Sequence, residues 1–119
     1  MSKQGDRMKR ILKIGAVFLS ACSALSVAGG NSGFRSIDYL QQRECATNKG
    51  FTITLSSYHE NPDSCADNLR LEVPCDAPGF DQMVSISLTA LAADKEVQAY
   101  VSGCDGENQA KVIALTIKK

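Results

Sequence analysis

The sequence predicts a small, mainly β domain with one helix and two disulfides, preceded by an export signal. Three observations predict it. Several short runs alternate between apolar and polar residues, as half-buried strands do. One longer segment, residues 80–95, follows helix-start signals and has an alanine-rich end. Four cysteines follow the leader, and four cysteines in a short exported chain are typical of two disulfides.

The first 28 residues are typical of a secretory signal peptide. A basic opening precedes an apolar stretch at residues 11–19, which is too short to be a spanning helix. Ser26-Val27-Ala28 provides the small residues of a cleavage site, and cleavage there leaves Gly29 as the new N-terminus. A start at Met8 would give a more compact signal. The predicted mature chain is therefore exported.

A second interpretation of the leader uses Cys22. Leu19-Ser20-Ala21-Cys22 fits a bacterial lipobox, in which the cysteine is lipidated. That processing would attach the chain to the envelope, and it is the only route to a membrane that we expect. The two interpretations differ in the mature N-terminus and in localisation: secreted or periplasmic for the first, lipid-anchored for the second.

The charge of the mature chain excludes one class of partner. Without residues 1–28, eight basic and twelve acidic residues remain, a net charge of −4. Affinity for nucleic acids comes mainly from Lys and Arg neutralising phosphates, so we expect no nucleic-acid partner. Residues 29–33 are a flexible lead-in, and residues 34–119 are one small domain, of the size for which disulfides matter to stability.

Three strands are predicted in the first half of this domain. Residues 34–43 form a weakly patterned strand, and a turn follows near Asn48 and Gly50. Residues 51–57 alternate apolar and hydroxyl side chains, as a half-buried strand does. After a polar loop, residues 69–73 alternate again, and the next residue, a proline, ends this strand.

The second half predicts a helix and a hairpin. Asp76 as the cap, Pro78 in the first turn and Asp81 near the positive end of the dipole are helix-start signals. The helix, residues 80–95, also fits a period of two in part, but its length favours helix. Its apolar stripe would hold Phe80, Met83, Val84, Leu88 and Leu91.

The predicted hairpin follows directly. Residues 96–102 form a strand with Val97, Ala99 and Val101 on one face, and residues 103–109 form its turn. Residues 110–117 carry apolar side chains on both faces, which favours a central position in the sheet.

The order strand, strand, strand, helix, strand, strand predicts a five-stranded OB-like barrel. In that topology Cys45, in the first hairpin turn, lies on the rim where the third strand ends at Cys75. Cys65 lies on the opposite rim, which the fourth strand reaches at Cys104. Of three possible connectivities, the topology therefore selects Cys45–Cys75 and Cys65–Cys104.

The residues suggest a binding surface and no catalyst. His59 is the single histidine, and it lies in a polar loop with no predicted pocket for a nucleophile and base to converge. No CxxC pair is present, so we expect no zinc or other metal site, and no cofactor. Residues 58–61, which include Tyr58 and His59, could form a contact surface, the alternative being an ordinary solvated turn. Tyr39, Tyr58 and Tyr100 could stack on a sugar ring.

Residues 76–117 also carry a resemblance. An alanine-rich helix followed by KEVQAYVSGC, a K-x-V-x-x-x-V-S-G-C strand, resembles the B subunits of pentameric A–B toxins of the subtilase-cytotoxin and pertussis types. The resemblance implies an OB-like core, a pentameric homo-oligomer, and binding of sialylated glycans in a shallow pocket. In that group a pair of cysteines matches Cys65 and Cys104. A serine and an acid near the first strand line the pocket there, and Ser32, Ser36 and Asp38 occupy this region.

These observations predict a secreted, non-enzymatic binding domain whose ligand is a glycan. The alternative is a periplasmic or envelope-attached accessory or inhibitor protein that acts by binding another protein.

Overall fold

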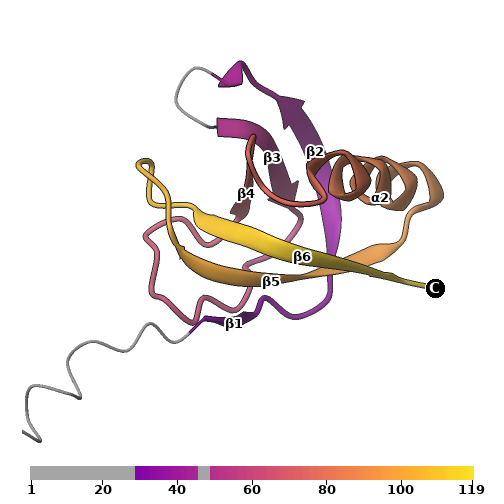
Figure 1. The fold of residues 1–119 in the computed structure, drawn as a ribbon. Helices are drawn as coiled ribbons and strands as arrows, with labels where there is room; N and C mark the ends of the chain where they lie inside the picture. The colour runs from indigo at the N-terminus through magenta and orange to yellow at the C-terminus, as the bar shows by residue number, and fades with distance from the viewer. Residues whose placement is uncertain (1–28, 46–48) are drawn as a thin grey trace, which may run out of the picture.

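A computed structural model of the chain describes residues 29–45 and 49–119. In that part, the protein is mainly β with one helix, as the sequence predicts (Figure 1). The predicted signal peptide, residues 1–28 with Cys22, and part of the first predicted turn lie outside the described residues. The elements in chain order are β1 (Gly30–Asn31), β2 (Arg35–Gln42), β3 (Lys49–Leu55), β4 (Arg70–Pro74), α2 (Phe80–Ala93), β5 (Glu96–Cys104) and β6 (Ala110–Lys118).

The strand pairings close on themselves. β2 pairs with β3 and β3 with β4, both antiparallel. β4 then pairs with β6 in parallel, β6 with β5 antiparallel, and β5 with β2 antiparallel. The five longer strands therefore form a ring of pairings in which each has two neighbours, and the central position predicted for β6 is confirmed.

The number of strands differs from the prediction of five. The described residues form a six-stranded sheet, because a short strand, β1, lies in the stretch interpreted as a lead-in. Gly30 and Asn31 pair with Val101 and Tyr100 of β5. Such a short strand has no apolar alternation, so its position depends on main-chain pairing that the sequence pattern does not reveal.

The core lies inside the ring and is lined by alternate residues of the strands. Phe51, Ile53 and Leu55 of β3 are all at most 4% exposed. The intervening residues of β3 are buried as well, so both faces of this strand are covered. The buried apolar core consists of Ile37, Phe51, Ile53, Leu55, Cys65, Leu71, Val73, Met83, Ala90, Val97, Ala99, Val101, Ala110 and Val112.

Irregular pairings change which face of the hairpin is buried. Tyr100 pairs with Ala114 but Val101 with Val112, so Ile113 is an extra residue on β6. Ile113 is consequently 54% exposed, and the inward positions change parity on either side of it. Strict alternation along residues 110–117 could not predict this shift.

The helix begins and packs differently from the prediction. Its N-cap is Gly79, in the left-handed region at φ 76°, and no side chain caps it, so Asp76 does not have the predicted role. Asp81 does lie in the first turn. The helix packs against β2 and β6. Its buried face is Met83, Ser87 and Ala90, flanked by the partly buried Phe80 and Val84.

The predicted apolar stripe of the helix is therefore half right. Leu88 and Leu91 are 53% and 41% exposed, whereas the small residues Ser87 and Ala90 face the sheet. The Ser87 hydroxyl donates to the Met83 carbonyl, 2.8 Å away, which satisfies it within the helix. Hydropathy alone ranks leucine above serine for burial, so it selected the wrong side at this end of the helix.

Both predicted disulfides are confirmed. Cys45 is bonded to Cys75 and Cys65 to Cys104, with Cα–Cα distances of 5.8 and 5.6 Å. Two such bonds in one small domain indicate an oxidising compartment, outside the cytosol. No helix in the described part of the chain combines the length and the apolar character that crossing a membrane requires.

Candidate functional site

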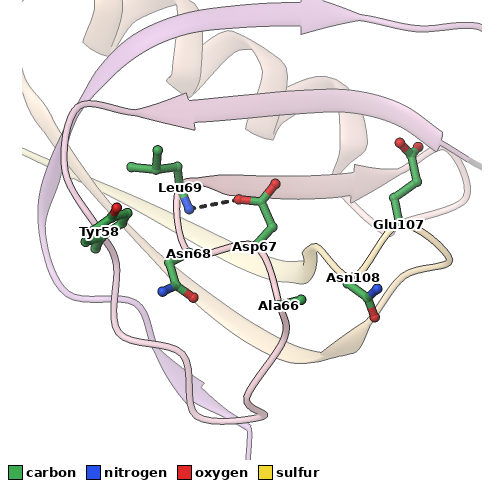
Figure 2. A pocket seen from close by; sticks show the side chains of 7 residues that line it. All are labelled: Tyr58, Ala66, Asp67, Asn68, Leu69, Glu107 and Asn108. Carbon is green, nitrogen blue, oxygen red and sulfur yellow. Dashed lines mark hydrogen bonds between the residues drawn. The ribbon is translucent and has the colours of Figure 1, made fainter.

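A hollow of about 450 Å³ lies where two loops meet. The loop between β3 and β4 supplies Tyr58 and the stretch 66–69, and the turn between β5 and β6 supplies Glu107 and Asn108 (Figure 2). Figure 2 shows Tyr58 and Asn68 on one side, Glu107 and Asn108 on the other, and Asp67 between them. The lining combines one aromatic ring with carboxamide and carboxylate groups.

Asp67 holds the floor of the hollow in place. Its Oδ1 accepts hydrogen bonds from the backbone N–H groups of Leu69 and Arg70, at 2.9 and 3.0 Å. Its own N–H donates to the Asn108 carbonyl, 3.0 Å away, which joins the two loops. The Cys65–Cys104 disulfide joins the same loops close by. The hollow is thus preformed, since a disulfide and a backbone hydrogen bond both connect its two sides.

Tyr58 provides the largest exposed surface at the hollow. Its side chain is 69% exposed, while its carbonyl accepts a hydrogen bond from Arg35 Nε at 2.9 Å. The backbone is therefore held and the ring is left for contact. A tyrosine side chain has an apolar ring face and a polar hydroxyl. It therefore suits ligands that have one apolar side and one hydrated side.

A second tyrosine is connected to this site through Arg70. The nearby Thr54 hydroxyl and then the Arg70 guanidinium lower the pKa of Tyr39, which is 45% exposed. The guanidinium of Arg70 also donates to Asp67 Oδ2, 3.4 Å away. Arg70 therefore links Tyr39 to Asp67, although Tyr39 does not itself line the hollow.

Of the five residues predicted to bind a ligand, Tyr58 alone lines the hollow. Ser32 is fully buried, and its Oγ accepts from the N–H of Ala99 at 2.9 Å, so it joins the start of the domain to β5. Ser36 is half-buried in β2. Asp38 is exposed, at an irregular position of the same strand.

His59 is next to Tyr58 in sequence but points inward. It is 5% exposed, and its Nδ1 lies 2.8 Å from the Glu60 carbonyl. A carbonyl only accepts, so Nδ1 is assigned the proton that it donates to this oxygen. The predicted contact surface at residues 58–61 therefore consists of Tyr58 and not of its histidine neighbour.

The sequence alone does not mark Asp67, Asn68 or Asn108 as part of a site. Acidic and amide residues in polar loops are typical of ordinary turns, and Asp67 and Asn108 do have turn roles. The usable signal was their position beside Cys65 and Cys104, because residues next to bonded cysteines are brought together with them.

A different polar group lies under the turn between β5 and β6. Glu72 on β4 is 1% exposed, and Thr52 donates to its Oε2 at 2.9 Å. Burial is the main cause that raises the pKa of Glu72, and the nearby Asp105 carboxylate raises it further. Glu107 forms ion pairs with Arg43 and Lys49. A buried, poorly compensated carboxyl is costly when charged.

We expect Glu72→Gln to stabilise the domain at pH 7 by about 1 kcal/mol. The pKa of Glu72 is raised in the folded state. In the unsubstituted protein, the folded state therefore binds the Glu72 proton more tightly than the unfolded state does. Its stability should therefore fall as pH rises from about 4.5 through the folded pKa. Glutamine should flatten that slope. Urea unfolding between pH 4 and 8 measures both effects.

Glu107→Gln is the matched control for this test. Hydrogen bonds from Lys49 and then Arg43 lower the pKa of Glu107, so its contribution to stability is lost as pH falls, the opposite sign. A Glu72→Gln variant with an unchanged pH slope would contradict the role of burial at Glu72.

Another hollow, of about 320 Å³, has a more apolar lining. One side of it is the loop that precedes α2, and the other side is β6, which contributes Ile113. In residues 29–45 and 49–119, no group of three or more His, Cys, Asp or Glu side chains is arranged to hold a metal ion.

Comparison of the chain with family models, with curated proteins and with solved structures finds no match.

Proposed function

We propose that this protein is an exported, non-enzymatic domain that binds a carbohydrate in the hollow beside Tyr58. The observation that carries the proposal is the exposed Tyr58 ring next to preformed amide and carboxylate groups. Sugars present C–H faces that lie against aromatic rings, and hydroxyl groups that pair with amide and carboxylate oxygens. A few placed polar groups in a concave site are the usual basis of small-ligand specificity.

The closed ring of strand pairings supports an OB-like barrel as the scaffold. OB folds bind oligosaccharides through loops and neighbouring strands. The hollow lies on two such loops, which a disulfide connects. The scaffold would hold the site rigid, so that little entropy is lost on binding.

The charges at the hollow favour a neutral sugar. Both carboxylate oxygens of Asp67 already accept hydrogen bonds, and the Glu107 carboxylate is paired with two cations. The residues that line the hollow include two acids and no lysine or arginine, so an anionic ligand would meet no positively charged lining residue. The toxin resemblance implies sialylated glycans, which are anionic. A glycan array that contains both kinds distinguishes neutral from sialylated ligands.

The two disulfides and the leader support secretion or release into the periplasm. A lipid anchor on Cys22 is the alternative, and it would place the same hollow at the envelope surface. The toxin resemblance adds a ring-shaped homo-oligomer to the proposal. The native mass of the exported protein distinguishes a pentamer from a monomer.

Tyr58→Ala tests the proposed site. We expect a glycan array to identify neutral glycans, and titration calorimetry to show binding about 30-fold weaker in the variant, the effect of truncating a central aromatic contact. Tyr100→Ala is the matched control, because Tyr100 is also exposed (44%) but does not line the hollow. Equal affinities for the two variants would contradict the site.

Protein binding is the second candidate function. Its support is the apolar hollow beside Ile113, which is 54% exposed. An array without any glycan hit, for a correctly folded exported protein, would favour an accessory or inhibitor protein that uses this surface.

A further inference from the structure

One carboxylate connects the start of the folded chain to the last hairpin. The backbone nitrogen of Gly29 donates to Asp63 Oδ1 at 3.0 Å. The backbone nitrogen of Gly103 donates to Asp63 Oδ2 at 2.6 Å. Asp63 thus uses both oxygens to join the residue before β1 to β5, and it lies two residues before Cys65 in the disulfide-bonded loop.

The surroundings of Gly29 show that this contact is closely packed. Gly29 has φ 54°, and a Cβ at this position would stand 3.3 Å from the Val101 carbonyl. A side chain is therefore disfavoured at this position by both backbone conformation and space. The next residue, Gly30, pairs with Val101 in the sheet.

The nitrogen that Asp63 holds belongs to the residue that the leader prediction makes the new N-terminus. Hydrolysis of the Ala28–Gly29 bond by signal peptidase adds one water: the Ala28 carbonyl carbon takes the hydroxyl, and the Gly29 nitrogen takes the hydrogen. That nitrogen binds a further proton near neutral pH. A neutral N–H with one donor thereby becomes an ammonium with three donors and a positive charge.

We infer that Asp63 is the receptor for the processed N-terminus, and that cleavage converts the Gly29–Asp63 hydrogen bond into an ion pair. The pair ties β1 to the loop and to the bulged end of β5, beside Cys104. Removal of the leader therefore increases the free energy of unfolding of the domain. This inference rests on the predicted cleavage after Ala28 and is independent of the proposed carbohydrate binding.

Two further titratable side chains face this site. The Tyr100 hydroxyl lies 3.5 Å from the point where a Gly29 Cβ would stand. The Lys111 ammonium lies 3.7 Å from the corresponding point at Gly103. An α-amino group has an ordinary pKa of about 7.7–8.0, and an anion at hydrogen-bond distance raises it. The stabilisation is present below that range and is lost as pH rises through the folded pKa.

The test exports the full chain and lets it be processed. Intact mass should show a mature chain that begins at Gly29. A second chain carries one asparagine inserted between Ala28 and Gly29, so that the ammonium is displaced by one residue. At pH 6 its unfolding equilibrium constant should be roughly tenfold larger than that of the parent, equivalent to one unit of α-amino pKa, and the difference should vanish near pH 10.

Asp63→Asn provides the second arm. Asparagine keeps a hydrogen-bond acceptor but not the charge, so the parent and inserted chains should become equally stable at pH 6 in this background. NMR titration of labelled Gly29 should also show its α-amino pKa back in the ordinary range. Asp94→Asn is the control, an exposed aspartate at the helix end in a conformation that asparagine tolerates.

Three outcomes would overturn the inference. One is a mature chain that begins elsewhere, such as a lipidated Cys22. Another is an α-amino pKa that is the same with and without the Asp63 charge. The last is an inserted chain as stable as the parent at pH 6, which decides the matter even if Asp63→Asn does not fold.

Discussion

Replacing Cys65 and Cys104 with serine is expected to lower the free energy of unfolding by about 4 kcal/mol. The bond closes a loop of 39 residues, and without it the unfolded chain gains the entropy of opening that loop. A small domain has about 5–15 kcal/mol of stability in total, so this loss is a large share. Urea unfolding of the oxidised parent and the double variant measures it.

The double variant at Cys45 and Cys75 is the matched control. Its loop of 30 residues predicts a loss of similar size, because loop entropy changes slowly with length. The two variants should differ in ligand binding. Cys65 and Cys104 are next to the residues that line the Tyr58 hollow, whereas Cys45 and Cys75 are not part of those loops. A Cys65/Cys104 variant that loses under 1 kcal/mol would contradict the role of this bond.

Leu71→Ala is expected to cost about 2–5 kcal/mol, the range for truncating a buried leucine. Leu71 is fully buried on β4, opposite Ile53 of β3 and Ala110 of β6. The β4–β6 pairing is the parallel contact of the ring, and its residue opposite Leu71 is a small alanine. Ala110 cannot fill the space that the missing methyl groups leave, so a cavity should remain beside this pairing.

Leu88→Ala removes the same atoms from the exposed face of α2. Because Leu88 is 53% exposed, we expect a loss within about 0.5 kcal/mol. Thermal or urea unfolding of both variants compares the two sites directly. Equal losses at Leu71 and Leu88 would mean that α2 buries the stripe predicted from sequence, and would contradict the observed helix face.

The regular strands and the cysteine pairing could be predicted from sequence because each depends on a simple pattern. The alternation at residues 51–57 marks β3, and the predicted OB-like topology places Cys65 and Cys104 on the same rim. Irregular features could not be predicted in the same way. The extra residue at Ile113 interrupts the alternation within the last hairpin, and the short strand β1 depends on pairing with β5, a distant segment of the chain.

The candidate site was predictable only in part. The sequence identified Tyr58 as a possible contact residue, but its partners Asp67 and Asn108 resemble ordinary turn residues until the two loops meet. Ser32, predicted near a pocket, is buried, and its hydroxyl accepts a structural hydrogen bond from the Ala99 N–H. Polar residues carry no sequence signal that separates a ligand contact from a structural hydrogen bond.

The sequence by itself determined the element types, the export signal as an expectation, and the cysteines that pair, since these follow from local periodicity, composition and chain order. Only the tertiary structure decided which face α2 buries, where the sheet pairing slips, and which loop residues surround one hollow. The physical reason is range: hydropathy and turn chemistry act between near neighbours in the chain, whereas burial and site geometry arise from contacts such as Asp63 with Gly29, 34 residues apart.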